Sequence, residues 1–190
     1  MDEVCPVIDD DARRFIEAQH MFFVATAPLD PDGHVNLSPK GLDTFRILDR
    51  GRVAYLDFNG SGVETISHLR ENGRIVLMFC SFQGPPKIFR LHGHGRVVEP
   101  NEAEFESLKA NFQNHDAVRS IIVIELNRVA DSCGYGVPLF NYEGERKQLI
   151  AWAHTKGPEG LEAYREENNA RSIDGLPGIR VQKVEQVTIA

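Results

Sequence analysis

Short runs of β-branched and aromatic residues alternate with turns rich in Gly, Pro, Asp and Asn through the first two thirds of the chain. This pattern predicts antiparallel strands joined by tight turns. A first hairpin is expected from residues 20–27 and 34–40, and a second pair from 45–48 and 52–58. Longer strands follow at 74–82 and 87–98, and a last one at 120–129. Sequential strands with short connections favour an antiparallel barrel over alternating βαβ units.

Helical spacing of apolar residues predicts helices around these strands. Acidic Asp9, Asp10 and Asp11 open the first helix, because carboxylates are favourable at the positive end of a helix dipole. A short helix with Val63 and Ile66 on one side is expected to end at residues 72–73, an Asn-Gly pair that suits a helix C-terminus. Residues 146–153 and 159–167 also read as helices, separated by a Gly-Pro pair. We therefore predict a barrel domain over residues 1–130 and a helical and loop extension over residues 131–190.

The overall charge and composition exclude several classes of protein. The 190 residues carry 21 basic and 28 acidic side chains, a net charge of −7, and no basic face of the kind that nucleic-acid binders show. No apolar run approaches the ~20 residues of a membrane span, and the N-terminus lacks a secretory signal pattern. Three scattered cysteines suit reduced thiols better than a disulfide framework. These features predict a cytoplasmic protein without nucleic-acid or membrane partners.

The end of the second strand is the first candidate binding segment. Residues 36–40 read Asn-Leu-Ser-Pro-Lys, so the strand ends with a hydroxyl, a proline and a cation. Pro39 removes one hydrogen-bond donor from the sheet, which suits an edge or bulge where a planar ligand has access to backbone groups. Lys40 adds positive charge beside it. Without a ligand, the same segment is only a capped strand end.

A second candidate is the Gly-rich turn at residues 59–62, which runs into the short helix carrying Glu64 and Thr65. Free N–H groups at a helix start favour phosphate binding. The turn lacks the Lys-Ser or Lys-Thr ending of a P-loop and the third glycine of a dinucleotide fingerprint. The alternative interpretation is an ordinary helix cap.

Two histidines, His92 and His94, share one face of a predicted strand, but no third ligand is close in sequence, so a metal site is not expected. A nucleophile motif such as GxSxG is also missing. The sequence therefore identifies no catalytic residue.

Taken in order, several of these segments resemble the FMN-binding split barrel of the pyridoxamine 5′-phosphate oxidase family. The resemblance rests on residues 22–26 (FFVAT), 35–41 (VNLSPKG), 53–58 (VAYLDF), 65–74 and 89–93 (FRLHG). It implies a mainly β, α+β fold: a six-stranded antiparallel split β-barrel with peripheral helices. It also implies a homodimer with FMN at the subunit interface.

The same resemblance implies which residues contact the cofactor. Asn36, Leu37, Ser38, Pro39 and Lys40 would follow the isoalloxazine and ribityl chain, and Asp57 and Phe58 would offer backbone contacts. Glu64 and Thr65 stand where the oxidases carry a basic pair for the FMN phosphate. Glu64 departs from that pattern, so it must point away or pair with a base such as Arg74 or Arg90. The basic cluster that binds substrate phosphate in the oxidases is missing around residues 112–119.

The expected function is an FMN-binding oxidoreductase that transfers two electrons to or from a small molecule. Lys40 is the expected partner of the FMN phosphate or of the negative charge on the reduced ring. Two alternatives stay open: a flavin-binding or flavin-sensing protein without activity, and a split barrel that uses deazaflavin or haem instead.

Overall fold

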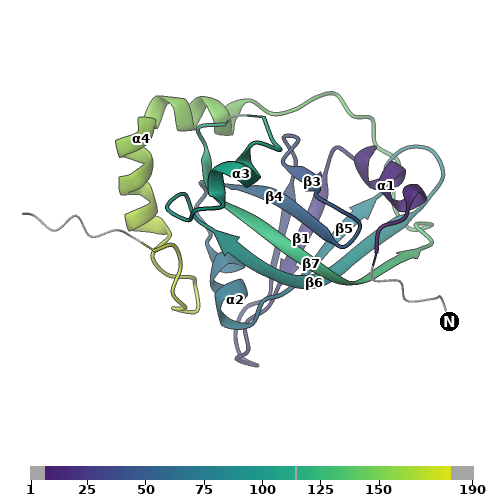
Figure 1. The fold of residues 1–190 in the computed structure, drawn as a ribbon. Coiled ribbons are helices and arrows are strands. Elements are labelled where there is room, and N and C mark those ends of the chain that lie inside the picture. Colours follow the sequence, from purple (N-terminus) through teal and green to yellow (C-terminus); the bar gives the residue numbers. More distant parts are fainter. Residues whose placement is uncertain (1–6, 114, 181–190) are drawn as a thin grey trace, which may run out of the picture.

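The computed structural model describes residues 7–113 and 115–180. Its centre is one antiparallel sheet that curls into a split barrel (Figure 1). The strands are β1 (Phe22–Thr26), β2 (Asn36–Lys40), β3 (Phe45–Ile47), β4 (Arg52–Phe58), β5 (Arg74–Cys80), β6 (Ile88–Val98) and β7 (Val118–Ser132). Their order across the sheet is β2-β1-β5-β6-β7-β4-β3. The predicted antiparallel, mainly β architecture with peripheral helices is confirmed.

The number of strands differs from the six of the predicted barrel, since the described residues form seven, one in each of the seven predicted segments. Both members of the second predicted pair, 45–48 and 52–58, form strands. The first of them, β3, has only three residues but pairs in register with β4. As a result, β2 and β3 are consecutive in the chain but occupy the two edges of the sheet. Residues 41–44 connect these edges across the split in the barrel.

The core explains the continuous apolar sequence of β4. Val53 and Tyr55 belong to the main core cluster, whereas Ala54 and Leu56 pack into a second cluster with Phe105 of α3 (Phe105–Lys109). All four side chains are at most 1% exposed. Because both faces of β4 are covered, the strand shows no alternation of apolar and polar residues.

The other helices follow the sequence signals. Helix α1 (Asp10–Glu17) is capped by Asp9, whose carboxylate accepts a hydrogen bond from the backbone N–H of Ala12 at 2.7 Å. Helix α2 (Glu64–Asn72) ends at Gly73, which adopts the left-handed conformation with φ of 71°. Gly73 is needed there because this conformation is costly for residues with a Cβ.

The chain after β7 leaves the barrel and returns to it. We call residues 134–147 the strap; it crosses to the start of α4 (Gln148–Asn168) on the opposite side of the molecule (Figure 1). Helix α4 is interrupted at Gly157, with φ of 64°, before Pro158, as the Gly-Pro signal predicted. Residues 169–180, the C-terminal loop, return toward α2. The proposed domain boundary after residue 130 stays a prediction.

The described residues, 7–113 and 115–180, lack two features. No helix there combines the length and apolarity needed to cross a membrane. No group of three or more His, Cys, Asp or Glu side chains there is arranged to hold a metal ion. Cys80 is buried and Cys133 exposed, both as free thiols, and Cys5 lies outside the described residues.

Candidate functional site

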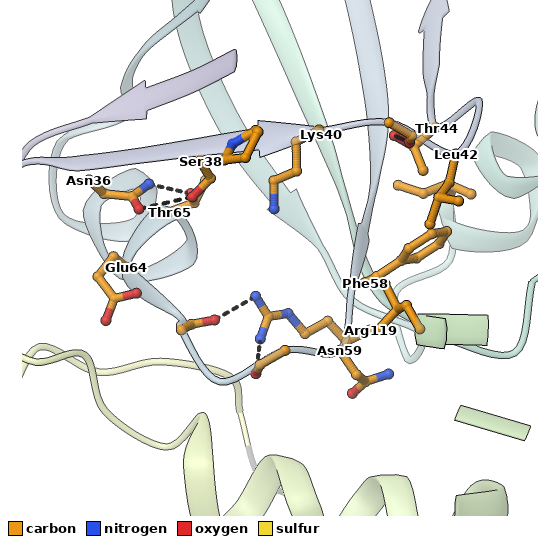
Figure 2. Close-up of a pocket in the computed structure, with 16 residues that line it drawn as sticks. Asn36, Ser38, Lys40, Leu42, Thr44, Phe58, Asn59, Glu64, Thr65 and Arg119 are labelled. Atoms are coloured by element: carbon orange, nitrogen blue, oxygen red, sulfur yellow. Dashed lines mark hydrogen bonds between the residues drawn. The ribbon is translucent and has the colours of Figure 1, made fainter. Parts of the chain in front are cut away.

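A cavity of about 340 Å³ opens between β2, the loop after β4, the start of α2 and the start of β7 (Figure 2). Seven of the nine predicted cofactor-binding residues line it: Asn36, Ser38, Pro39, Lys40, Phe58, Glu64 and Thr65. Leu37 and Asp57 do not. The fold therefore brings together two sequence segments that were predicted separately.

The alternation of β2 decides which of its residues face the cavity. Asn36, Ser38 and Lys40 point toward it, because successive side chains of a strand face opposite sides. Leu37 points away and is 64% exposed. The predicted contact of Leu37 with a cofactor is therefore limited to its backbone in this conformation.

Asn36 connects β2 to β1 and α2 through its side-chain amide. Its Nδ2 group donates to the hydroxyl of Thr65 at 2.9 Å and to that of Thr26 at 3.3 Å. The Thr26 hydroxyl in turn bonds Nδ1 of His68 at 2.9 Å. The Thr65 hydroxyl, which accepts this bond, still has one hydrogen to donate, either to the neighbouring buried Tyr55 hydroxyl or to a ligand acceptor in the cavity.

The start of α2 is not capped by any side chain of the described residues. Its N-cap residue is Val63, which has no side-chain acceptor to offer. This observation argues against the alternative that the Gly-rich turn only forms an ordinary cap. The first N–H groups of α2 and the positive end of its dipole thus lie beside the cavity.

Glu64 was expected either to point away or to pair with a base. Its carboxylate accepts a hydrogen bond from the backbone N–H of Ile173 in the C-terminal loop at 3.3 Å. Arg74 bonds the Pro28 carbonyl, and Arg90 bonds the Ser132 hydroxyl. The proposed pairing of Glu64 with Arg74 or Arg90 is therefore wrong, because both guanidinium groups are engaged elsewhere.

Below the cavity lies a fully buried carboxylate, Asp57. One oxygen is 2.7 Å from Nε of Arg119 and the other 3.4 Å from Nζ of Lys40. Burial acts to raise the pKa of Asp57, but Arg119 and then Lys40 outweigh it and hold that pKa below its ordinary value. Asp57 therefore acts through its side chain, by fixing two cations at the floor of the cavity.

Arg119 is the functional residue that sequence reasoning missed. Besides Asp57, its guanidinium donates to the carbonyls of Gly60 and Gly62 and to the side chain of Asn169. Four of its five N–H groups are thereby used, and among the described residues the fifth has no acceptor. A signal was present: Asp57 and Arg119 are opposite charges at the ends of two otherwise apolar strand sequences, which suggests a buried pair.

The connection between β2 and β3 forms another wall of the cavity. Leu42 and Asp43 have positive φ angles of 61° and 52°, which are strained for residues other than glycine. Asp43 is held by Arg46, and the backbone N–H of Leu42 donates to Glu145 of the strap at 3.2 Å. A local ion pair and one long-range contact from the strap therefore maintain the strained turn.

The histidine pair lies away from this cavity. His94 packs over Gly73 at the end of α2, where a Cβ would collide with its ring. Neither His92 nor His94 lines the cavity.

Comparison with known proteins gave concordant results. The family model described as pyridoxamine 5′-phosphate oxidase matches residues 8–133. A protein of Aspergillus flavus, the pyridoxamine 5′-phosphate oxidase family protein ustO, is 38% identical over 189 residues, covering 90% of this chain and 76% of that protein.

Solved structures show the same fold at low identity. HupZ of Group A Streptococcus has a TM-score of 0.52 at 20% identity, over 65% of this chain and 93% of its own. A structure from Lactobacillus delbrueckii that bears the name pyridoxamine 5′-phosphate oxidase has a TM-score of 0.52 at 14% identity, over 66% of this chain and 95% of its own.

Proposed function

Because the chain belongs to the pyridoxamine 5′-phosphate oxidase family, we propose that it binds FMN in the cavity between β2, the loop after β4 and α2. One observation carries the proposal. The uncapped start of α2, the Thr65 hydroxyl and the Lys40 ammonium all face the same cavity. Helix N–H groups, a hydroxyl hydrogen and a cation are the donors that a phosphomonoester requires.

Charge compensation near the phosphate is the main physical requirement. A phosphomonoester carries about −1.5 to −2 charges, while the whole protein has a net charge of −7. Screening limits the reach of distant charges to about 8–10 Å, so the compensating groups must be close. Lys40 and Arg119 supply positive charge at the cavity, and Asp57 neutralises part of it.

Glu64 is the unfavourable group at this site. The bond from Ile173 holds one of its oxygens toward the C-terminal loop, which reduces its repulsion of a phosphate at the start of α2. Asn36 orients Thr65, and the Arg119 bonds to Gly60 and Gly62 fix the loop that precedes the helix. These residues bind and orient the cofactor in the proposal.

Bound FMN would supply a two-electron acceptor and donor, chemistry that no side chain provides. We propose that the protein uses it to oxidise or reduce a small molecule, and that it works as a homodimer. The chain's own contribution is to bind and orient the ring system and to place the Lys40 charge nearby.

The absorbance spectrum of the purified full-length protein tests this function, followed by mass spectrometry of the released cofactor. We expect a flavin spectrum and the mass of FMN. A Soret band or a deazaflavin mass would overturn the FMN assignment. A flavin that dithionite bleaches, in a protein that turns over no reductant, would instead support a flavin-binding protein without activity.

A further inference from the structure

A second and larger cavity, of about 960 Å³, lies between the strap and the barrel. It shares Pro39, Lys40, Gly41, Leu42 and Leu149 with the proposed FMN cavity, so the two spaces adjoin along the end of β2. Its volume is within the range of small-molecule sites. The strap and α4, which form its outer wall, lie beyond residues 8–133 that match the family model.

The strap is attached to the barrel by two contacts that line this cavity. In the first contact, the backbone N–H of Phe140 donates to the carbonyl of Phe82 at 2.9 Å, and the two rings lie 5.4 Å apart. In the second contact, Tyr142 stacks on His20 with centroids 3.7 Å apart and planes 9° apart. The outer wall is thus held by specific contacts.

Glu145 joins the strap to the strained turn that both cavities share. One carboxylate oxygen accepts from the Tyr142 hydroxyl at 3.0 Å, and the other accepts from the backbone N–H of Leu42 at 3.2 Å. These bonds engage both oxygens of the carboxylate. They also couple the position of the strap to the conformation of Leu42.

The lining of the larger cavity is mainly apolar and includes two cations, Lys40 and Arg146. The apolar side chains come from both walls: Met21, Leu42, Phe82, Phe140, Tyr142 and Leu149. Lys40 is already paired with Asp57. Arg146 also lines the cavity, and within residues 7–113 and 115–180 it makes no hydrogen bond or ion pair.

We propose that this cavity binds the small-molecule substrate, and that the substrate has a flat aromatic or similarly apolar body and a carboxylate. The apolar walls would cover the body, and the Arg146 guanidinium would pair with the carboxylate, for which its planar fork is well suited. The proposal rests on the proposed FMN function, because only the adjoining FMN cavity makes this a substrate site.

Naphthoate, an aromatic carboxylate, and its uncharged amide naphthamide are suitable probes. Binding is measured by calorimetry on the full-length protein, with and without FMN. We expect Arg146→Gln to weaken naphthoate about tenfold or more and to leave naphthamide unchanged, as for loss of a charged hydrogen-bond partner. Tyr142→Ala should weaken both probes. Lys147→Gln, a change at the neighbouring cation outside the cavity lining, is the matched control.

Equal naphthoate affinity in Arg146→Gln and the unchanged protein would overturn the proposal, as would equal losses in Arg146→Gln and Lys147→Gln. The proposal would also be overturned if the unchanged protein bound neither probe and Phe140→Ser dissociated the dimer. That result would assign the strap to a subunit interface. FMN affinity is titrated separately by flavin fluorescence. The protein could also bind naphthoate through Arg146 and yet fail to bind FMN. That result would contradict the proposed function but would still support a binding site for an aromatic carboxylate in this cavity.

Discussion

Lys40 and Thr65 are the side chains on which the proposed phosphate site depends most. Lys40→Ala and Thr65→Ala should each weaken FMN binding by about 1–3 kcal/mol, the loss typical of a hydrogen-bond partner to a charged group. Neither change should unfold the barrel, since Asp57 keeps Arg119 as its partner and Thr65 lies in the first turn of α2. Titration with FMN, followed by flavin fluorescence, measures the effect.

Lys109→Ala is the matched control for Lys40→Ala, because it makes the same charge change on α3, outside the cavity lining. It should leave FMN affinity unchanged. Unaltered affinity in both Lys40→Ala and Thr65→Ala would remove this phosphate site and the residue assignments with it.

His68 supports the same site from within the core and adds a dependence on pH. It is 0% exposed, and burial lowers its pKa despite the opposing carboxylates Asp174, Glu64 and Glu71. The unfolded chain therefore binds a proton at His68 at a higher pH than the folded protein does. As pH falls below about 6.5, the ordinary histidine pKa, the free energy of unfolding should decrease.

Denaturant unfolding at several pH values between about 5 and 7 measures this dependence. We expect His68→Asn to reduce its slope, because the substituted side chain does not titrate. His154→Asn, at an exposed position of α4, should keep the original slope. Identical slopes for His68→Asn and the unchanged protein would contradict the assignment.

At the scale of elements, the C-terminal loop positions the site from outside the barrel. Asn169 bonds both Arg119 and the Gly60 carbonyl, and Ile173 bonds Glu64. Asp174 accepts from His34 in the β1–β2 hairpin. Residues far apart in sequence therefore hold the Gly-rich loop and the start of α2 in place.

Gly178 tests this role, because a Cβ at that position would collide with the carbonyl of Asn169 and touch Val63. We expect Gly178→Ala to destabilise the protein by about 1–3 kcal/mol, as overpacking does, and to weaken FMN binding. Thermal unfolding and FMN titration measure the two effects. Gly136→Ala is the control, since a Cβ there meets no atom within 4 Å. Equal behaviour of the two variants would disprove the role of the loop.

Local patterns were sufficient to predict most elements, but the prediction did not separate the inward from the outward side chains of β2, since it included Leu37. The N-cap of α1 at Asp9, the C-terminal cap of α2 at Gly73 and the break at Gly157 follow from the preferences of single residues for particular backbone conformations. The Arg119–Asp57 pair, separated by 62 positions, depends on the pairing of β4 with β7. The contacts of Glu64 with Ile173 and of Leu42 with Glu145 likewise depend on where the extension folds back, which no local pattern encodes.

At the scale of the whole molecule, β2 is an open edge of the sheet. One side pairs with β1, and among the described residues no strand pairs with the other. Val35 and Leu37 expose 73% and 64% of their surface near this edge. Apolar residues on an unprotected edge strand favour association with another chain, and a twofold homodimer is the commonest solution.

We therefore expect a homodimer that covers the β2 edge and places the adjoining FMN cavity near the interface. Leu37→Lys should shift the protein toward monomer, because the added charge would have to be desolvated in the interface, and it should weaken FMN binding in parallel. Ile173→Lys makes the same change at an exposed apolar residue of the C-terminal loop, and it should leave the dimer intact. Light scattering at micromolar concentration, combined with FMN titration, measures both properties. A stable monomer for the unchanged protein, or an unaltered dimer in Leu37→Lys, would contradict an interface at this edge.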